Sequence, residues 1–151
     1  MKILFINRLI TSSKIFFYSI ILALILSTSV LSNDETKNSV KLMVSLDPTL
    51  NNNLNPEHTL FIYARAAKGP RMPLAIVKHK AGELPLEVQL DASMAMMPQM
   101  SMNKFSQLIF LARISASGQA MPQSGDLIGE TGVLEWQKLD KPVAIVINKH
   151  L

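Results

Sequence analysis

The sequence predicts an all-β fold, an antiparallel β-sandwich of seven to eight short strands. Apolar and polar residues alternate with a period of two in several segments, which is typical of strands with one buried face. Turn signals built from glycine, proline and asparagine recur about every 8–12 residues, and no stretch has a convincing helical period. A partly open barrel is the alternative architecture.

The strand pattern is clearest in residues 86–90, where three apolar residues alternate with two polar ones. Segment 107–115 is long and apolar. The stretch just before it cannot be a central strand, because Pro98 has no N–H to donate to a β-ladder. The expected strands are residues 40–46, 58–65, 74–79, 86–90 and 107–115, a short one around 127–128, and then 133–136 and 143–148.

Residues 1–32 have the pattern of a signal peptide or an N-terminal membrane anchor helix. Three basic residues and no acidic one occur in this segment, the apolar stretch 15–26 lies within it, and residues 30–32 offer a Val-x-Ser cleavage site. The mostly apolar part is about sixteen residues long, short of the roughly 20 needed to cross a bilayer. We favour a cleaved signal peptide over a retained anchor. In both cases the rest of the chain is expected outside the cytoplasm.

The polar residues 33–39 are expected to form a flexible linker, and residues 40–151 the β-sandwich domain. Without residues 1–32 the chain has twelve basic and eleven acidic residues and no basic run interleaved with aromatics, which argues against nucleic acid as a partner. The chain has no cysteine. That excludes thiol–disulfide exchange, covalent haem attachment and thiolate metal sites.

The sequence offers little for catalysis. The three histidines, His58, His79 and His150, are expected at exposed or edge positions. No nucleophile elbow, His-Glu-x-x-His pair or phosphate-binding glycine-rich loop is present. Asp126 and Glu130 each follow a glycine, which is ordinary hairpin chemistry. We therefore expect a protein that is not an enzyme and has no cofactor.

Five of the nine residues from Met94 to Met102 are methionine. Packed thioethers can form a soft metal site of the kind that Cu(I) prefers, here from Met94, Met97 and Met100. They can also form an adaptable apolar surface that binds other polypeptides. The third interpretation is structural, because methionine fills gaps and such a run can plug one end of a sandwich.

Methionine followed by proline recurs at 72–73, 97–98 and 121–122, and three such corners could gather at one end of the sandwich. Two arginines close apolar strands and are expected at the core rim with their heads in water. If their strands are neighbours, they could instead form a paired cationic site for a carboxylate. The predicted contact surface comprises Met94, Met96, Met97, Pro98, Met100, Met121, Pro122, Arg65 and Arg113.

Five segments occur in an order that resembles one family, the C-terminal domain of the cytochrome c biogenesis protein CycH, also called CcmI, or the corresponding end of a fused CcmH. The resemblance runs from about residue 40 to 148, nearly the whole predicted domain. The segments are 61–66 (FIYARA), 69–75 (GPRMPLA), 84–86 (LPL), 91–100 (DASMAMMPQM) and 112–127 (ARISASGQAMPQSGDL).

The resemblance implies an immunoglobulin-like periplasmic β-sandwich that takes part in delivering apocytochrome c to the haem-ligation complex. It implies no catalysis and no metal. Family members usually carry membrane helices and a helical repeat region, whereas this sequence goes from residues 1–32 to the predicted sandwich within a few residues. The sequence therefore predicts a non-catalytic accessory or scaffold module. Its expected partners are other maturation proteins, among them a separate helical-repeat subunit and apocytochrome c.

Overall fold

The computed structural model describes residues 38–151, without the side chains of residues 51–53. The predicted leader 1–32 and all but the last two residues of the predicted linker 33–39 lie outside the described residues. Nine strands and six short 3-10 turns make up the described part. The strands are β1 (Ser39–Leu46), β2 (Thr59–Ala66), β3 (Ala75–Lys80), β4 (Leu86–Asp91), β5 (Gln107–Ser115), β6 (Leu127–Glu130), β7 (Leu134–Glu135), β8 (Val143–Ile147) and β9 (Lys149–His150).

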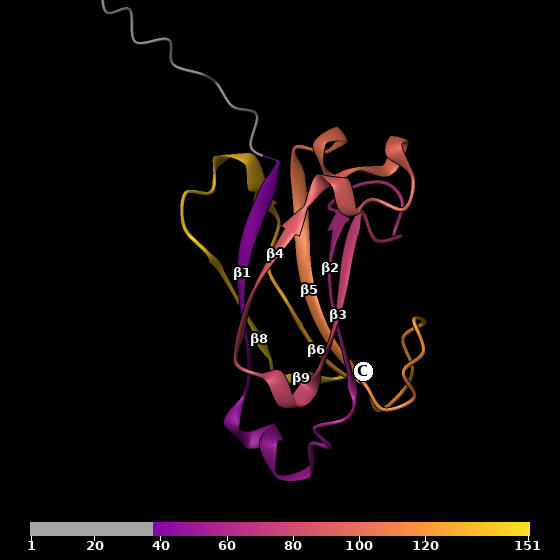
Figure 1. The fold of residues 1–151 in the computed structure, drawn as a ribbon, viewed down its shortest axis with the longest axis vertical. Coiled ribbons are helices and arrows are strands. Elements are labelled where there is room, and N and C mark those ends of the chain that lie inside the picture. The colour runs from indigo at the N-terminus through magenta and orange to yellow at the C-terminus, as the bar shows by residue number, and fades with distance from the viewer. Residues whose placement is uncertain (1–37) are drawn as a thin grey trace, which may run out of the picture. The chain divides into compact units, whose positions relative to one another are not determined.

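The strands form two sheets, which confirms the all-β prediction (Figure 1). One sheet has the order β4-β1-β8, and the other has the order β3-β2-β5-β6-β9 with β7 also paired to β5. The prediction of a purely antiparallel sandwich is wrong in one place, since β1 and β8 run parallel. Parallel pairing needs a long connection, and here the whole of the six-stranded sheet except β9 lies between the two strands in sequence.

The core lies between the two sheets and follows the period-two pattern of the sequence. In β1 the even-numbered residues from Val40 to Val44 are buried, and in β2 the even-numbered residues from Leu60 to Ala66 are buried. Trp136, at the start of the 3-10 turn η6 (Trp136–Lys138), is fully buried in the same core. Its indole N–H donates to the carbonyl of Phe105 at 2.8 Å, which satisfies the only polar atom of that side chain.

Strand direction defines two ends of the domain. Ala66 of β2 pairs with Leu108 at the start of β5, whereas Thr59 pairs with Ser115 at its end. The loops 67–74 and 92–106 therefore lie at one end, which we call the methionine end. The loop 116–126 lies at the other, which we call the opposite end. We call residues 92–106 the methionine loop; it connects β4 of one sheet to β5 of the other.

One side of the sandwich is closed where the chain passes from β8 to β9. Asn148 N–H donates to the carbonyl of Ile128 in β6 at 3.2 Å, so the chain crosses from one sheet to the other there. A Cβ atom at Gly129 would lie 2.2 Å from the carbonyl oxygen of Val146. Only glycine allows this approach of two backbones.

Within residues 38–151, no helix has the length and apolar character required to cross a membrane.

Candidate functional site

The methionine loop divides into an inward part and an outward part. Met102 is fully buried in the core, and the half-buried Met100 packs against it. Met94 and Met96 face outward, with 38% and 78% of their surface exposed. The plug and the surface that the sequence offered as alternatives therefore occur together, in different residues of one loop.

Short-range hydrogen bonds order this loop. The Asp91 carboxylate accepts from the backbone N–H of Ser93 at 2.7 Å and caps the 3-10 turn η3 (Ala92–Met94). That hydrogen bond holds the pKa of the Asp91 carboxyl below its ordinary value. The Ser101 hydroxyl donates to the carbonyl of Ala92 at 2.9 Å and closes the stretch that carries the outward methionines. These contacts present the exposed thioethers from an ordered backbone.

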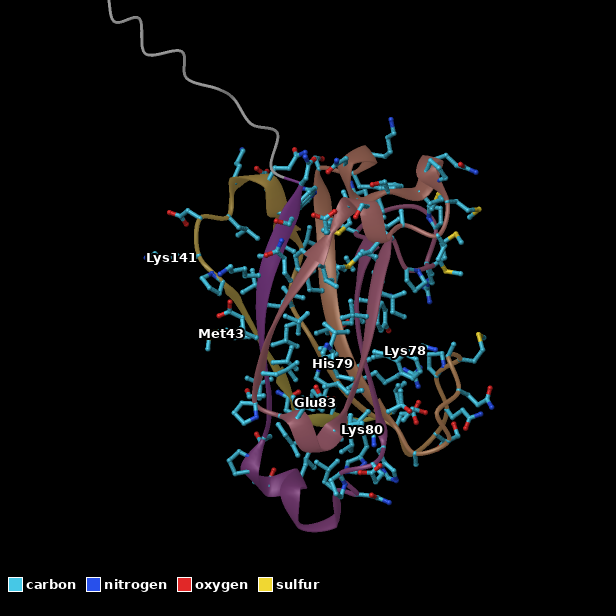
Figure 2. All side chains as sticks on the ribbon, viewed as in Figure 1. Met43, Lys78, His79, Lys80, Glu83 and Lys141 are labelled. Carbon is cyan, nitrogen blue, oxygen red and sulfur yellow. The ribbon has the colours of Figure 1, made fainter. Side chains whose placement is uncertain are left out.

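The loop 67–74 adds a further exposed thioether at the same end. Ala67 N–H donates to the carbonyl of Gln107 at 3.1 Å, and Leu74 N–H donates to that of Ala64 at 2.8 Å, so both ends of the loop are fixed to the sheet. Met72 on this loop is 39% exposed. Sulfur atoms gather at this end of the molecule in Figure 2. The surface of the methionine end therefore includes Met72, Met94, Met96, the half-buried Met97 and the exposed Pro98.

Met121 and Pro122 do not join this surface, so the expectation that three Met-Pro corners gather at one end is wrong. The methionine loop leads into the first residue of β5, whereas Met121 lies on the loop 116–126, which follows the last residue of β5. A nine-residue strand spans about 30 Å. Met121 is 75% exposed, at the opposite end.

Arg113 is buried, with 1% of its side chain exposed, so the expectation of a rim arginine with its head in water is wrong. Its guanidinium forms an ion pair with the buried Asp126 and donates to the carbonyls of Gln119 and Ala120, the latter at 2.7 Å. It also stacks over the Phe61 ring, 4.8 Å from the centroid. Arg113 thus holds the loop 116–126 against the sheet and is not available to a partner.

Arg65 lies on the same outer face as Arg113, because β2 and β5 are neighbours as the paired-site hypothesis required. The two do not form a paired site. Arg65 is opposite Ile109 and Arg113 is opposite Phe61, with Tyr63 between them. Arg65 reaches Glu130 at 3.5 Å in a partly exposed pair. Burial holds the pKa of the Tyr63 phenol above its ordinary value, against the opposing effect of the two arginine charges.

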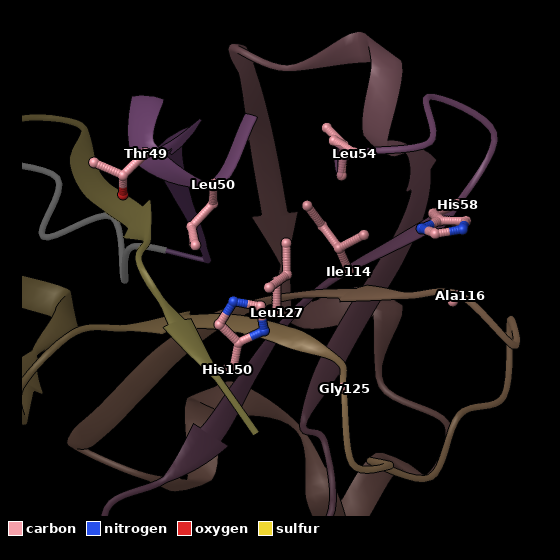
Figure 3. Close-up of a pocket in the computed structure, with 9 residues that line it drawn as sticks. All are labelled: Thr49, Leu50, Leu54, His58, Ile114, Ala116, Gly125, Leu127 and His150. Atoms are coloured by element: carbon pink, nitrogen blue, oxygen red, sulfur yellow. The ribbon is translucent and has the colours of Figure 1, made fainter. Parts of the chain in front are cut away.

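A cavity of about 330 Å³ opens at the opposite end (Figure 3). Its lining is mostly apolar and includes Leu50, Leu54 and Ile114, with His58 and His150 on different walls. Among the residues that the structure describes, no carboxylate, cysteine or lysine lines it. His79 lies elsewhere, with its ring nitrogen 2.7 Å from a carboxylate oxygen of Glu83. The structure thus brings two of the three histidines to one cavity.

The predicted Cu(I) trio is spread over different environments. Met94 is exposed, the half-buried Met97 accepts a weak hydrogen bond from the Gln99 amide at 3.9 Å, and Met100 packs against the core. Among residues 38–151, no three histidine, cysteine or carboxylate side chains form a group that could hold a metal ion.

The sequence did not predict the roles of three residues, Asp126, Glu130 and Met102. Asp126 and Glu130, interpreted as hairpin residues, are the partners of the two arginines. A signal was available, since an arginine on an apolar strand needs a partner when it is buried, and carboxylates follow later in the sequence. Met102 was left out of the predicted contact surface, but its role as the buried anchor of the loop was not predicted.

The chain matches the family described as "Cytochrome c-type biogenesis protein H Ig-like domain" over residues 40–148. The protein "Cytochrome c-type biogenesis protein CycH" of Pseudomonas aeruginosa is 35% identical over 91 residues, which are 60% of this chain and 22% of that relative. The chain therefore aligns with about a fifth of the length of that relative. No solved structure matches.

Proposed function

Because the chain belongs to the family of the cytochrome c-type biogenesis protein H Ig-like domain, we propose that it acts in c-type cytochrome maturation as a non-catalytic interaction module. The module works outside the cytoplasm, on the periplasmic side of the membrane. Its task is to hold other maturation proteins in place, which is an accessory or scaffold role.

One observation carries the proposal: Met72, Met94 and Met96 are exposed on two ordered loops at one end of the domain. Exposed apolar side chains cost free energy in water unless something covers them. Thioethers are flexible and polarisable, so a methionine surface adapts to different partner side chains. We therefore assign the contact with partners to the methionine end, without Arg113, Met121 and Pro122.

The partners are other proteins of cytochrome c maturation, including a helical-repeat subunit and apocytochrome c. A rigid β-sandwich with loops at its end suits this role, because the sheets fix the loops while the loops supply the contacts. The histidine cavity at the opposite end lacks a carboxylate or lysine beside its imidazoles, which supports a function other than catalysis.

The experiment is a haem stain of c-type cytochromes from cells that lack this gene, with apocytochrome measured by immunoblot in the same samples. We expect haem-bound cytochrome to be lost while apoprotein is still made, and to return when the full chain is supplied again. Normal haem-bound cytochromes in the deletion strain would contradict the proposed role.

A further inference from the structure

The two loops that carry the exposed methionines contain positively charged residues and no acidic ones. Residues 67–74 contain Lys68 and Arg71, the methionine loop contains Lys104, and neither segment contains an acidic residue. All three cations are exposed. Within the described part of the chain, the six ion pairs with N–O distances up to 4.0 Å involve other residues. Within residues 38–151, the exposed methionines thus share their loops with cations that form no ion pair.

Two of these cations line one hollow of about 220 Å³. Lys68 and Lys104 lie on its wall with Phe105, Ser106 and Gln107. The hydrogen bond from Ala67 N–H to the Gln107 carbonyl fixes the two segments beside each other. Phe105 packs against the core, and its carbonyl accepts the indole N–H of Trp136, so the floor of the hollow is anchored. The residues that line the hollow carry two ammonium groups, a hydroxyl, an amide and an aromatic ring.

Two carboxylates at this end of the domain, Glu135 and Asp91, already have partners. Glu135 is paired across the sheet with Gln107, but its carboxylate lies 2.5 Å from the Lys138 ammonium. Asp91 precedes the methionine loop, and its carboxylate accepts the Ser93 N–H. Neither neutralises the two lysines of the hollow. An anion from outside therefore has a favourable place there.

We propose that the methionine end binds an acidic polypeptide segment. A side-chain carboxylate of that segment lies between Lys68 and Lys104, and its apolar side chains cover Met72, Met94 and Met96. This inference rests on the proposed function and names the chemistry of the partner. The hollow is large enough for an aspartate or glutamate side chain, and the surrounding methionines favour a polypeptide over a free inorganic anion.

Charge and apolar contact have separate roles in such a surface. The lysines attract an acidic segment and select it over a basic one, which affects the association rate and depends on salt. The methionines supply the contact that is retained at high salt. Loss of the lysines and loss of the methionines should therefore weaken binding in distinguishable ways.

The test uses the full chain in its host, with a photo-crosslinking amino acid placed at Ser106 beside the hollow or at Gln99 beside the methionines. Crosslinked peptides are identified by mass spectrometry. We expect Ser106 to crosslink a peptide with aspartate or glutamate within a few residues. The Lys68→Gln, Lys104→Gln double variant should lower the yield at both positions by roughly tenfold, since two exposed charge pairs are lost. The matching arginine variants should retain it. Lys149→Gln is the control, an exposed lysine on β9 at the opposite end.

Four results would overturn the inference. A neutral or basic crosslinked peptide, or lysine variants with unchanged yield, would leave the proposed contact surface standing and remove its acidic selectivity. Crosslinking to lipid at Ser106 would replace the polypeptide with a membrane surface. Crosslinking at neither position would contradict both this inference and the assignment of the contact surface to the methionine end.

Discussion

The tripeptide Met-Pro-Gln occurs twice, at residues 97–99 and 121–123, and the two copies lie at opposite ends of the domain. The first belongs to a loop anchored by apolar packing, with Met100 and Met102 inserted toward the core. The second belongs to a loop anchored by charge, where buried Arg113 binds Asp126 and two backbone carbonyls. We propose a contact surface for only one of the two copies, because their three-dimensional neighbours differ.

The first copy lies near Met72, Met94 and Met96, so its surroundings are apolar and positively charged. The second copy contributes a single exposed methionine, Met121, and its Gln123 N–H donates to Asp126, whose charge is already paired with Arg113. A repeated motif is therefore a poor guide to a binding surface until the strand order places it.

The largest expected effect is a loss of stability at the loop 116–126, which is anchored by charge. Arg113→Ala leaves the buried Asp126 carboxylate without its partner, and breaking such a pair costs about 3–5 kcal/mol of unfolding free energy. Urea denaturation measures it. Arg65→Ala is the matched control on the same sheet face: its pair with Glu130 is partly exposed, so the cost should stay below about 1 kcal/mol. Equal losses for both variants would show that Arg113 has no special anchoring role.

The apolar anchor of the other loop comes next. Met102→Ala removes a fully buried side chain, and such a truncation costs about 2–5 kcal/mol of unfolding free energy, with a fall in the thermal midpoint. Met96→Ala changes a side chain that is 78% exposed and should alter stability by less than about 0.5 kcal/mol. If Met96→Ala destabilised the domain as much as Met102→Ala, the division of the loop into plug and surface would be wrong.

The cap of the methionine loop should make stability depend on acid pH. The pKa of Asp91 in the folded state is lowered from its ordinary value of 3.8, so its charge stabilises the fold above that pH and the contribution is lost as the pH falls. Asp91→Asn keeps a side-chain acceptor without the titrating charge. The thermal midpoint of the variant should be lower than that of the wild type near pH 6, and the difference should shrink as the pH falls below 3.8. A constant difference across this range would contradict the assignment.

The smallest expected effect concerns copper. The three thioethers of the proposed Cu(I) trio lie in different environments, so we expect purified protein under reducing conditions to retain no more Cu(I) than the Met94→Ser, Met97→Ser variant. Metal analysis after gel filtration measures this. Near-stoichiometric retention by the wild type alone would favour the copper-binding alternative over the contact surface.

The strands were predictable because buried and less buried residues alternate in several of them, most clearly in β1 and β4. The predicted segment 107–115 has the same bounds as β5. The predicted strands that correspond to β1 to β4, β6 and β8 agree with them to within two residues at each end. Segment 133–136 fared less well, since only Leu134 and Glu135 pair and Trp136 turns into the core. β9 was missed, because two residues carry no periodicity.

The site was harder to predict because it depends on strand order. The local pattern predicts that β8 is a strand, but it does not predict that β8 runs parallel to β1. In the same way, an arginine on an apolar strand can reach water at the rim or bind a buried carboxylate, and only the position of Asp126 decides for Arg113. The five clustered methionines look alike in sequence, and the packing of the sandwich separates Met102 from Met96.

The central claim, that the methionine end is the contact surface, is tested most directly by complementation of the deletion strain with matched serine variants of the full chain. Met96→Ser and Met121→Ser change side chains that are 78% and 75% exposed at the two ends, so both should leave the thermal midpoint nearly unchanged. Combined with Met94→Ser, Met96→Ser should fail to restore haem-stained cytochromes, whereas Met121→Ser should restore them fully. Full restoration by the Met94→Ser, Met96→Ser variant would contradict the claim.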